Sequence, residues 1–299
     1  MSSRSNIKVS IIIPVYNNWG DTIETLRDLA KQELAAFQVL IADDGSPEPA
    51  PAEIFQFEFA RYYRGTNLGF GGNCNRAAAE AIDCGATHLL FLNNDTEFSK
   101  DFVGSWLGAI ESLPDAILSP LIYWSRWPGR VWYSGGRQSI LVPFCRLRKE
   151  YPVNTEVDVI CGCAMLVPVR VWEALGGFNE VYETYFEDFD LCLRARQLGV
   201  PIYVVADEEL KVRHKVSGSF RGPRIWKQQY LMLTTRLIFI RTHYRKLTQL
   251  LCLGLCLPHL LVMAIGALPR RPQLRLLWRA FVTGIRESNE AVGEVSQQG

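Results

Sequence analysis

Carboxyl and amide side chains follow two apolar runs in the first hundred residues of this 299-residue chain. The run LLFL stops at Asn93, Asn94 and Asp95, and the run FQVLIA stops at Asp43 and Asp44. Apolar runs of this length, closed by turn-forming residues, are typical of buried strands. Carboxylate oxygens bind divalent cations and accept hydrogen bonds, so the two groups could hold a nucleotide and a cation. For the DDGS segment alone, a simple turn explains the residues equally well.

The order of the segments up to about residue 125 indicates that both groups lie at one edge of a sheet. Strand-like and helix-like segments alternate, with strands expected at 9–15, 37–42, 60–63 and 88–92 and helices at 21–32 and 73–84. Such alternation predicts a parallel sheet with helices on both faces. Ligands of these sheets bind where the strands end, so the acids are placed to contact one.

A third group of acids is expected on a helix over residues 185–199, YFEDFDLCLRARQLG. At 3.6 residues per turn, Asp188 heads an inward-facing stripe that contains Leu191, Ala195 and Leu198. Burying an acid is costly unless it has partners, so the inward placement favours a chemical role. The alternative is that acids in the first turn only complement the helix dipole. Asp190 falls on another side, where Arg194 predicts a surface ion pair.

Residues 126–168 combine Trp, Gly and β-branched residues at irregular spacing, which predicts hairpins and loops around a second pocket. The segment WSRWPGRVWYSGG is rich in aromatic side chains and arginine. This composition suits the faces of sugars or anions, and it suits a packed loop equally well.

Several segments resemble the inverting nucleotide-sugar glycosyltransferases of family 2, and especially their bacterial rhamnosyltransferase-like branch. From about residue 9 to residue 245, these segments are VSIIIPVYNN, IADDGS, NLGFGGNCNRA, LLFLNNDT, GGFNEVYETYFEDFDLCLRARQLG and RHKVSGS. Each is a weak signal alone, whereas their order and spacing together are specific. The resemblance implies a GT-A fold of the α/β class, which is a Rossmann-like, mainly parallel mixed sheet with helices on both faces.

The resemblance also implies a nucleotide-sugar site. In the family, an acid in the DDGS position bonds the nucleotide base, the turn after the first strand lines the same pocket, and the glycine-rich stretch contacts the nucleotide. With the triplet after the fourth strand, the matching residues here are Pro14, Tyr16, Asn17, Asp43, Asn67, Gly71, Asn75, Asn94 and Asp95. The stretch is no dinucleotide fingerprint, because Cys74 stands at its third glycine position.

A divalent metal, Mg²⁺ or Mn²⁺, is the cofactor that the resemblance implies. The family usually carries an acidic D-x-D-type triplet, but this chain has Asn93-Asn94-Asp95, so only Asp95 remains as the metal-binding carboxylate. His214, in RHKVSGS, matches the family's late histidine that can complete the metal site. A cation held there would stabilise the charge that develops on the departing nucleoside diphosphate.

By position and by the same resemblance, Asp188 is the expected general base. The acceptor hydroxyl loses a proton as it attacks, and a carboxylate facing the anomeric carbon can take that proton. Glu187 would orient Asp188 or touch the acceptor. The chain offers no second acid clearly placed as a covalent nucleophile, so we expect a single displacement with inversion.

Charge is distributed unevenly along the chain, although the net charge is only +1. Residues 1–210 hold 17 Lys and Arg against 28 Asp and Glu, whereas residues 211–299 hold 15 against 3. Residues 247–269 carry no charged side chain, and the segment 274–286 places apolar side chains and arginines on opposite helical faces. The length of residues 247–269 permits one membrane span, but the basic flanks on both sides favour a kinked hairpin or an in-plane insertion at an anionic membrane surface. The alternative is a helix packed on the catalytic domain.

The sequence therefore predicts a GT-A catalytic domain over residues 1–222, followed by a basic, hydrophobic and membrane-associating helical extension over residues 223–299. The nucleotide-binding half would cover about residues 1–125, and the acceptor half about 126–222. We expect a cytoplasmic enzyme on the inner face of the cell membrane, with no nucleic acid partner. The resemblance to the rhamnosyltransferase-like branch implies that it transfers a sugar to a lipid-linked glycan in cell-surface polysaccharide biosynthesis. Rhamnose from dTDP-rhamnose is the first choice, and UDP or GDP donors are alternatives.

Three alternatives stay open. A nucleotide-sugar hydrolase or a nucleotidyltransferase could use the same sheet edge. The depleted triplet is also compatible with a non-catalytic carbohydrate- or nucleotide-binding module. A polymerising synthase is the third alternative, and the lack of a Q-x-x-R-W-type motif and of a multi-span channel argues against it.

Overall fold

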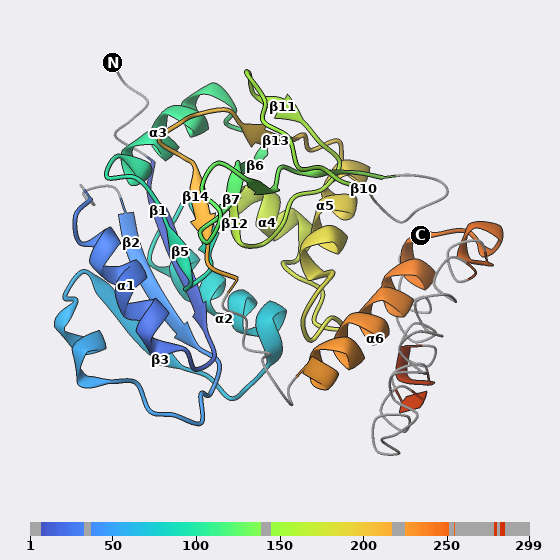
Figure 1. The fold of residues 1–299 in the computed structure, drawn as a ribbon, viewed down its shortest axis with the longest axis horizontal. Helices are drawn as coiled ribbons and strands as arrows, with labels where there is room; N and C mark the ends of the chain where they lie inside the picture. Colours follow the sequence, from blue (N-terminus) through green and yellow to red (C-terminus); the bar gives the residue numbers. More distant parts are fainter. Residues whose placement is uncertain are drawn as a thin grey trace.

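A central eight-stranded sheet with helices on both faces organises the computed structural model (Figure 1). The structure describes residues 7–32, 37–138, 145–216, 225–250, 254, 278–279 and 282–284. In spatial order, the strands are β11 (Thr155–Glu156), β13 (Ile202–Val205), β6 (Ile117–Pro120), β12 (Ala164–Pro168), β4 (His88–Leu92), β1 (Val9–Val15), β2 (Phe37–Asp43) and β3 (Ala60–Arg64).

The four strands β4, β1, β2 and β3 are parallel, as the alternation of segments predicts. Helices α1 (Trp19–Leu29) and α2 (Gly69–Asp83) connect them and cover opposite faces. Residues of β1 alternate between the two cores, because Ile12 packs on the α2 side whereas Ile11 and Ile13 pack on the α1 side. Each of these strands forms within one residue of its expected bounds, which confirms this half of the fold.

The sequence prediction names no strand in the other half of the sheet, and β12 is the most central of the strands that it misses. β12 is antiparallel to both of its neighbours, β4 and β6, and all five of its residues are buried. It lies within residues 126–168, for which the sequence predicts only hairpins and loops. A five-residue apolar run does not reveal its pairing partners, so the middle of the sheet could not be read from this segment.

A second, four-stranded sheet joins the residues after β4 to a hairpin later in the chain. Its order is β5 (Thr96–Glu97), β14 (Val212–His214), β7 (Ile122–Trp124) and β8 (Val131–Tyr133). His214 lies opposite Thr96 on one side and opposite Trp124 on the other. The remaining elements are α3 (Phe102–Ser112), α4 (Val169–Leu175) and the short pair β9 (Gly136–Arg137) and β10 (Cys145–Arg146).

Helix α6 (Ile225–His243) packs against helix α5 (Glu187–Gln197), which carries the third group of acids (Figure 1). Asp190 lies between them, with Oδ1 2.7 Å from His243 Nε2 and Oδ2 2.8 Å from Arg194 Nε. The expected pair of Asp190 with Arg194 is therefore present. Its expected position on the surface is wrong, because α6 covers Asp190 and leaves it 1% exposed.

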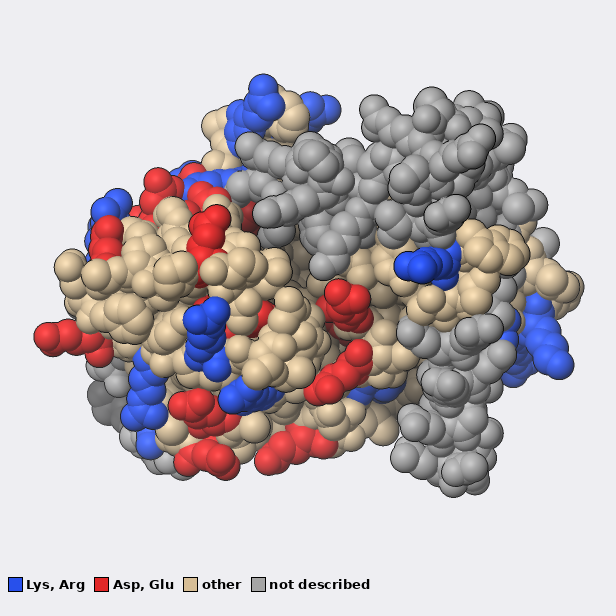
Figure 2. Space-filling view, turned by 90° about the horizontal axis from the view of Figure 1, so that it is seen from below, with Lys and Arg blue, Asp and Glu red and all other residues tan. Residues whose placement is uncertain are grey.

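The side chains of Ile238, Phe239 and Ile240 on α6 belong to the core on the α2 side of the sheet. The helix therefore packs on the body formed by the central sheet and its helices, and a domain boundary at residue 222 stays a prediction. Figure 2 shows acidic and basic side chains interspersed on the face of the molecule that it draws.

Among the helices that the structure describes, none combines the length and the apolar character needed to cross a membrane. Most of the uncharged segment 247–269 lies outside the described residues. The same is true of most of the segment 274–286, so the expected membrane association of the extension stays a prediction.

Candidate active site

Asp95 and His214 form a buried pair just beyond the end of β4. His214 Nε2 lies 2.9 Å from Asp95 Oδ1, and each residue is 7% exposed. The backbone holds this arrangement, because the N–H of Lys215 donates to the carbonyl of Asp95 at 3.0 Å and Thr96 pairs with His214. The structure thus brings together the two residues predicted as metal ligands.

These two residues fit half of a metal site. A carboxylate oxygen beside an imidazole nitrogen is a donor pair that can bind a divalent cation. The other ring nitrogen of His214, Nδ1, is buried and has no hydrogen-bond partner in the described part of the chain. The ring of Trp132 lies against the imidazole with centroids 4.6 Å apart. Within the described residues there is no group of three His, Cys, Asp or Glu that could hold a metal. Asp95 and His214 would therefore share a cation with oxygens of a bound substrate.

Asp188 lies in the first turn of α5 and faces the loop before β12. Its Oδ2 accepts a hydrogen bond from the N–H of Gly162 at 2.8 Å, and its Oδ1 accepts one from the N–H of Phe189 at 2.8 Å. Burial raises the pKa of Asp188 to about 6, although these backbone N–H groups lower it. The residue is nevertheless not fully covered. A partly accessible carboxyl with this pKa is ionised at neutral pH and suited to accept a proton.

The residues of α5 that follow Asp188 agree in part with the inward-facing stripe predicted from the sequence. Leu191 and Ala195 are completely buried, which confirms the inward face, but Leu198 is 58% exposed. The prediction for Leu198 is wrong because α5 ends at Gln197 and the chain turns away through Gly199, whose φ is +74°. A left-handed residue at this place, usually glycine, is the common way to end a helix.

Glu187 is buried directly beside Asp188. It is 6% exposed, and its Oε2 has no hydrogen-bond partner among the described residues. Burial, and then the neighbouring Asp188, raise the pKa of Glu187 well above its usual value. Two adjacent carboxyl groups in such a place do not both ionise. We assign the proton to Glu187 and the charge to Asp188, because Asp188 accepts the two backbone hydrogen bonds.

A short stretch of backbone joins Asp188 to the triplet after β4. The N–H of Gly162 binds Asp188, and the carbonyl of the next residue, Cys163, accepts a hydrogen bond from the N–H of Asn93 at 2.8 Å. Asp188 and Asp95 are thus supported by neighbouring strands, β12 and β4, at the edge where β4 ends. The expected chemistry would therefore occur at this edge of the sheet.

Asp43 ends β2 in register with Val15 and is completely buried. Its Oδ1 accepts hydrogen bonds from the backbone N–H of Ser46 at 2.8 Å and from the Ser46 hydroxyl at 2.5 Å. Its Oδ2 accepts one from the hydroxyl of Tyr62 at 2.8 Å. These bonds fix the DDGS turn, which supports the alternative interpretation of the segment. The expected contact of Asp43 with a nucleotide base stays a prediction.

The next acid, Asp44, fixes the glycine-rich stretch, a role that the sequence did not indicate. Its carboxylate accepts hydrogen bonds from the N–H groups of Leu68 at 2.7 Å and Gly69 at 3.0 Å. Gly69 has a φ of +78°, and a Cβ there would overlap the carbonyl oxygen of Glu183. At Gly71 a Cβ would lie 3.8 Å from the Cβ of Glu187. The stretch therefore passes close to the start of α5, and at Gly69 only glycine permits this approach.

Two asparagines of the predicted nucleotide-sugar site hold loops together. Asn75 donates from Nδ2 to the carbonyl of Phe178 at 2.9 Å and accepts at Oδ1 from the N–H of Phe178 at 2.8 Å. Asn94 donates from Nδ2 to the hydroxyl of Thr22 at 2.8 Å. Both amides thereby have a structural role, and their contact with a nucleotide sugar stays a prediction.

The other predicted residues lie at the same sheet edge. Pro14 pairs in register with Ala42, and Tyr16 follows β1 with a partly exposed side chain. Asn17 and Asn67 both adopt left-handed backbone conformations, with φ of +57° and +60°. Asparagine is one of the few residues that tolerate this conformation, which explains its use in these turns.

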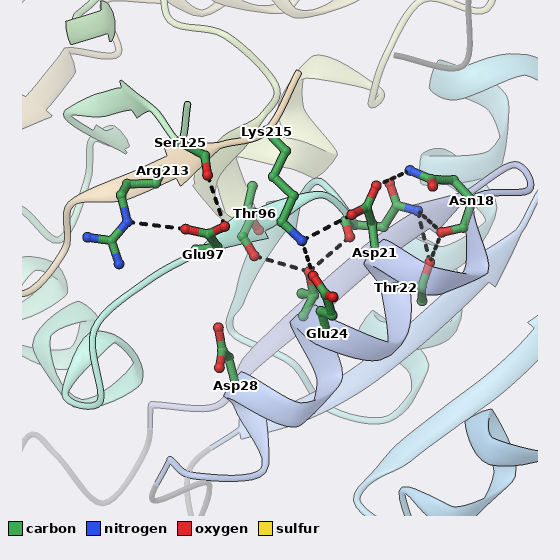
Figure 3. Close-up of polar contacts among 12 residues, drawn as sticks. Asn18, Asp21, Thr22, Glu24, Asp28, Thr96, Glu97, Ser125, Arg213 and Lys215 are labelled. Carbon is green, nitrogen blue, oxygen red and sulfur yellow. Dashed lines mark hydrogen bonds and ion pairs between the residues drawn. The ribbon is translucent and has the colours of Figure 1, made fainter. Parts of the chain in front are cut away.

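Lys215 directly follows β14 and binds two acids on α1, as Figure 3 shows. Its Nζ lies 3.0 Å from Asp21 Oδ1 and also contacts Glu24. Burial lowers the pKa of Lys215, but the contacts with the two acids outweigh this effect and raise the pKa. In the sequence, Asp21 and Glu24 indicate only a helix start, and nothing in their spacing points to a partner so far along the chain.

The chain matches the family model described as "Glycosyl transferase family 2" over residues 10–171, which is more than half of its length. It is 31% identical over 231 residues to N-acetylglucosaminyl-diphospho-decaprenol L-rhamnosyltransferase of Mycobacterium tuberculosis (strain CDC 1551 / Oshkosh), covering 66% of this chain and 74% of that protein. It is 25% identical to rhamnosyltransferase WbbL of Escherichia coli (strain K12), covering 70% and 85% of the two chains.

Solved structures show the same fold at low identity. GalNAc-T7, solved with UDP, GalNAc and Mn²⁺, has a TM-score of 0.60 at 13% identity, and the match covers 81% of this chain but only about half, 52%, of that one. Residues 1–349 of S. aureus TarS, solved in complex with UDP, have a TM-score of 0.54 at 16% identity over 98% and 92%. The fold is thus a mixed α/β, GT-A-like one. With the family match, this shows that the chain belongs to the family 2 glycosyltransferases.

Proposed function

We propose that this glycosyltransferase moves rhamnose from dTDP-rhamnose to a hydroxyl group of a lipid-linked glycan, with inversion at the anomeric carbon, in cell-surface polysaccharide biosynthesis. The names of the rhamnosyltransferase relatives support the sugar and the type of acceptor. The single observation that carries the mechanism is the position of Asp188. It is a partly accessible carboxyl whose pKa is raised by burial to about 6. It accepts a hydrogen bond from Gly162, just before β12, and β12 pairs with β4, after which the Asp95–His214 pair lies.

In the proposed reaction, Asp188 takes the proton from the acceptor hydroxyl as its oxygen attacks the anomeric carbon. The bond from that carbon to the diphosphate oxygen breaks at the same time, and its electron pair leaves with the nucleoside diphosphate. Glu187 keeps its own proton, so its carboxyl adds no negative charge that would oppose the ionisation of Asp188. A single displacement needs only one ionised carboxylate, and the pair of acids supplies one.

A divalent cation, Mg²⁺ or Mn²⁺, would be held by Asp95 and His214 and by oxygens of the donor. When bound, it would stabilise the negative charge on the departing diphosphate. Asn94 and the backbone of the triplet would keep Asp95 at the edge of β4. The remaining members of the predicted donor site would enclose the nucleotide: Asp43, the segment 14–17 at the end of β1 and the glycine-rich segment 67–75 at the start of α2.

A lipid-linked acceptor requires that the enzyme work close to a membrane. We propose a peripheral location on the cytoplasmic face, with the basic region after residue 222 as the part that contacts the lipid surface. Support comes from the balance of 15 basic against 3 acidic side chains in residues 211–299. Removing residues 247–299 should shift the protein from the membrane fraction to the soluble fraction, and unchanged partitioning would contradict this part of the proposal.

The function is tested by incubating the protein with nucleotide sugars, Mn²⁺ and an N-acetylglucosaminyl-diphospho-lipid. We expect release of nucleoside diphosphate that depends on both the metal and the acceptor. Nuclear magnetic resonance should show the transferred sugar with the anomeric configuration opposite to that in the donor. Release at the same rate without an acceptor would indicate a hydrolase instead. Donor binding without turnover of any nucleotide sugar would indicate a non-catalytic module.

A further inference from the structure

A cavity of about 510 Å³ opens between the β7–β8 hairpin and the segment after β10. Its lining includes Trp124, Trp127, Arg130, Arg148, Lys149 and Glu150. The cavity thus offers two indole rings, three cations and one acid. Its volume is within the usual range of small-molecule sites.

The cations of this cavity lie in a basic segment of an otherwise acidic part of the chain. Residues 116–149 hold six basic side chains and no acidic one, although residues 1–210 as a whole hold 17 basic and 28 acidic. The acid of the cavity, Glu150, already accepts a hydrogen bond from the hydroxyl of Tyr123 at 2.8 Å. A concave surface with clustered cations attracts anions, and arginine is suited to phosphate groups.

The indole rings supply a second kind of contact. Trp127 is 45% exposed, although its ring touches Trp124 at a centroid distance of 5.2 Å and the guanidinium of Arg126 at 5.4 Å. A tryptophan that served only to pack the loop would be covered by it. An exposed indole beside cations can pack against the apolar face of a sugar while a phosphate binds next to it.

The cavity adjoins the catalytic edge through a series of ring contacts. Trp124 touches Trp132 at 6.2 Å, and Trp132 touches His214 at 4.6 Å. Ser125, which Figure 3 shows beside Glu97, also donates its N–H to the carbonyl of His214 at 3.1 Å. A ligand in this cavity would therefore be a near neighbour of the residues expected to hold the metal.

The order of the smaller sheet separates this cavity from the expected donor side. β5 lies next to α1, where the hydroxyl of Thr25 donates to the carbonyl of Thr96 at 3.1 Å. β7 and β8 lie on the other side of His214. The expected nucleotide edge at β1 and β2 is on the α1 side, which favours the acceptor over the donor as the source of a phosphate bound in the cavity.

We propose that this cavity binds the phosphorylated saccharide head of the acceptor, with a phosphate at Arg130, Arg148 and Lys149 and a sugar ring on Trp127. The proposal rests on the proposed function, because it is the lipid-linked acceptor that brings a saccharide diphosphate to the enzyme. It adds the recognition site that selects such an acceptor. The same chemistry could recognise a nucleoside diphosphate, and the experiment below separates the two sources.

Calorimetric titration of the full chain with N-acetylglucosamine 1-diphosphate carrying a short alkyl group measures this binding without a donor. Arg148→Gln and Lys149→Gln should each weaken binding of this probe about tenfold, since each removes a charge-assisted hydrogen bond. Lys100→Gln, at an exposed lysine outside the cavity, is the matched control and should bind as the wild type does. Equal affinities of all these variants and the wild type would overturn the proposal.

Two further titrations identify what the cavity recognises. Affinity for dTDP with Mn²⁺ should be the same in Arg148→Gln and the wild type, which also shows that the variant is folded. If Arg148→Gln lost as much affinity for dTDP as for the saccharide probe, the cavity would be assigned to the donor and the proposal would be overturned. Trp127→Ala should weaken binding of the saccharide probe about tenfold but leave that of inorganic pyrophosphate unchanged. If Trp127→Ala lost equal affinity for the saccharide probe and for pyrophosphate, the sugar would not stack on Trp127.

Failure of this proposal can be distinguished from failure of the proposed function. Binding of the probe that depends on Arg148, in a protein that transfers no sugar, would support the cavity site and contradict the transferase reaction. Sugar transfer with the same KM for the acceptor in Arg148→Gln and the wild type would contradict the cavity site alone. Under both proposals, the KM for the acceptor rises about tenfold in this variant while kcat changes little.

Discussion

Replacing Asp188 by Asn should make the protein more stable at neutral pH, because the wild type keeps a charge in a poorly solvated place. Burial raises the pKa of Asp188 from 3.8 to about 6. In the folded state, ionisation is therefore less favourable than in the unfolded chain by about 3 kcal/mol, at 1.36 kcal/mol for each pH unit.

The sign of the pH dependence follows from this difference. Below about pH 4 the carboxyl is protonated in both states, and above about pH 6 it is ionised in both. Between these values the folded protein binds more protons than the unfolded chain, so the stabilising contribution of Asp188 is lost as the pH rises. Asn cannot ionise and lacks this dependence. It does lose one acceptor, because its amide nitrogen cannot accept from the N–H of Gly162 or Phe189, which costs about 1–2 kcal/mol at every pH.

Urea unfolding of the wild type and Asp188→Asn between pH 4.5 and pH 8 measures the effect. The difference in unfolding free energy should move in favour of the variant as the pH rises, by about 2–3 kcal/mol in total, and should level off above about pH 7. Asp83→Asn, at an exposed aspartate, is the matched control and should show no such change. A difference between Asp188→Asn and the wild type that is independent of pH would refute the assignment of a raised pKa to this carboxyl.

Other predictions concern the packing of α6, the glycine-rich stretch and the metal ligands. His243→Gln leaves buried Asp190 with one partner fewer and should lower the unfolding free energy at pH 7 by about 3 kcal/mol, measured in urea. Although burial raises the pKa of Asp190, its bonds to histidine and arginine lower it overall, so wild-type stability should fall as the pH drops below about 4. Gly69→Ala should lower the unfolding free energy by more than 2 kcal/mol, whereas Gly199→Ala, at similar φ but in open space, should cost about 1 kcal/mol. Asp95→Asn should raise the Mn²⁺ concentration for half-maximal activity at least tenfold, and an unchanged requirement would remove Asp95 from the metal site.

The half of the fold that could be predicted is the half in which local signals suffice. Apolar runs of strand length alternate there with helical segments, and the polar residues that end each run lie at one edge. β12 could not be predicted, because its place between β4 and β6 depends on pairing with strands far away in the chain. The start of α2 at Gly69 was missed for another reason, since glycines disfavour helices and tertiary packing overrides this preference here.

In the candidate site, too, local signals in the sequence predict some features, whereas others depend on distant parts of the chain. Helical periodicity was enough to predict the inward orientation of Asp188, whereas the burial of Asp190 depends on α6, which covers it from a distant part of the sequence. Only the resemblance to a family suggested His214 as a partner of Asp95, because no spacing rule connects a strand end with a residue so much later. The roles of Asp44 and Gly162 in holding the edge together had no signal in the sequence, since each acts through backbone N–H groups.

The role of Asp188 as the general base is tested most directly by single-turnover rates of sugar transfer at saturating donor and acceptor between pH 4.5 and pH 8. The wild-type rate should rise about tenfold per pH unit up to about pH 6 and then level off, as the carboxyl with this pKa becomes ionised. Asp188→Asn should bind the donor normally and transfer the sugar at least a hundredfold more slowly, with no rise over this range. A variant that keeps the wild-type rate and its pH profile would contradict the account.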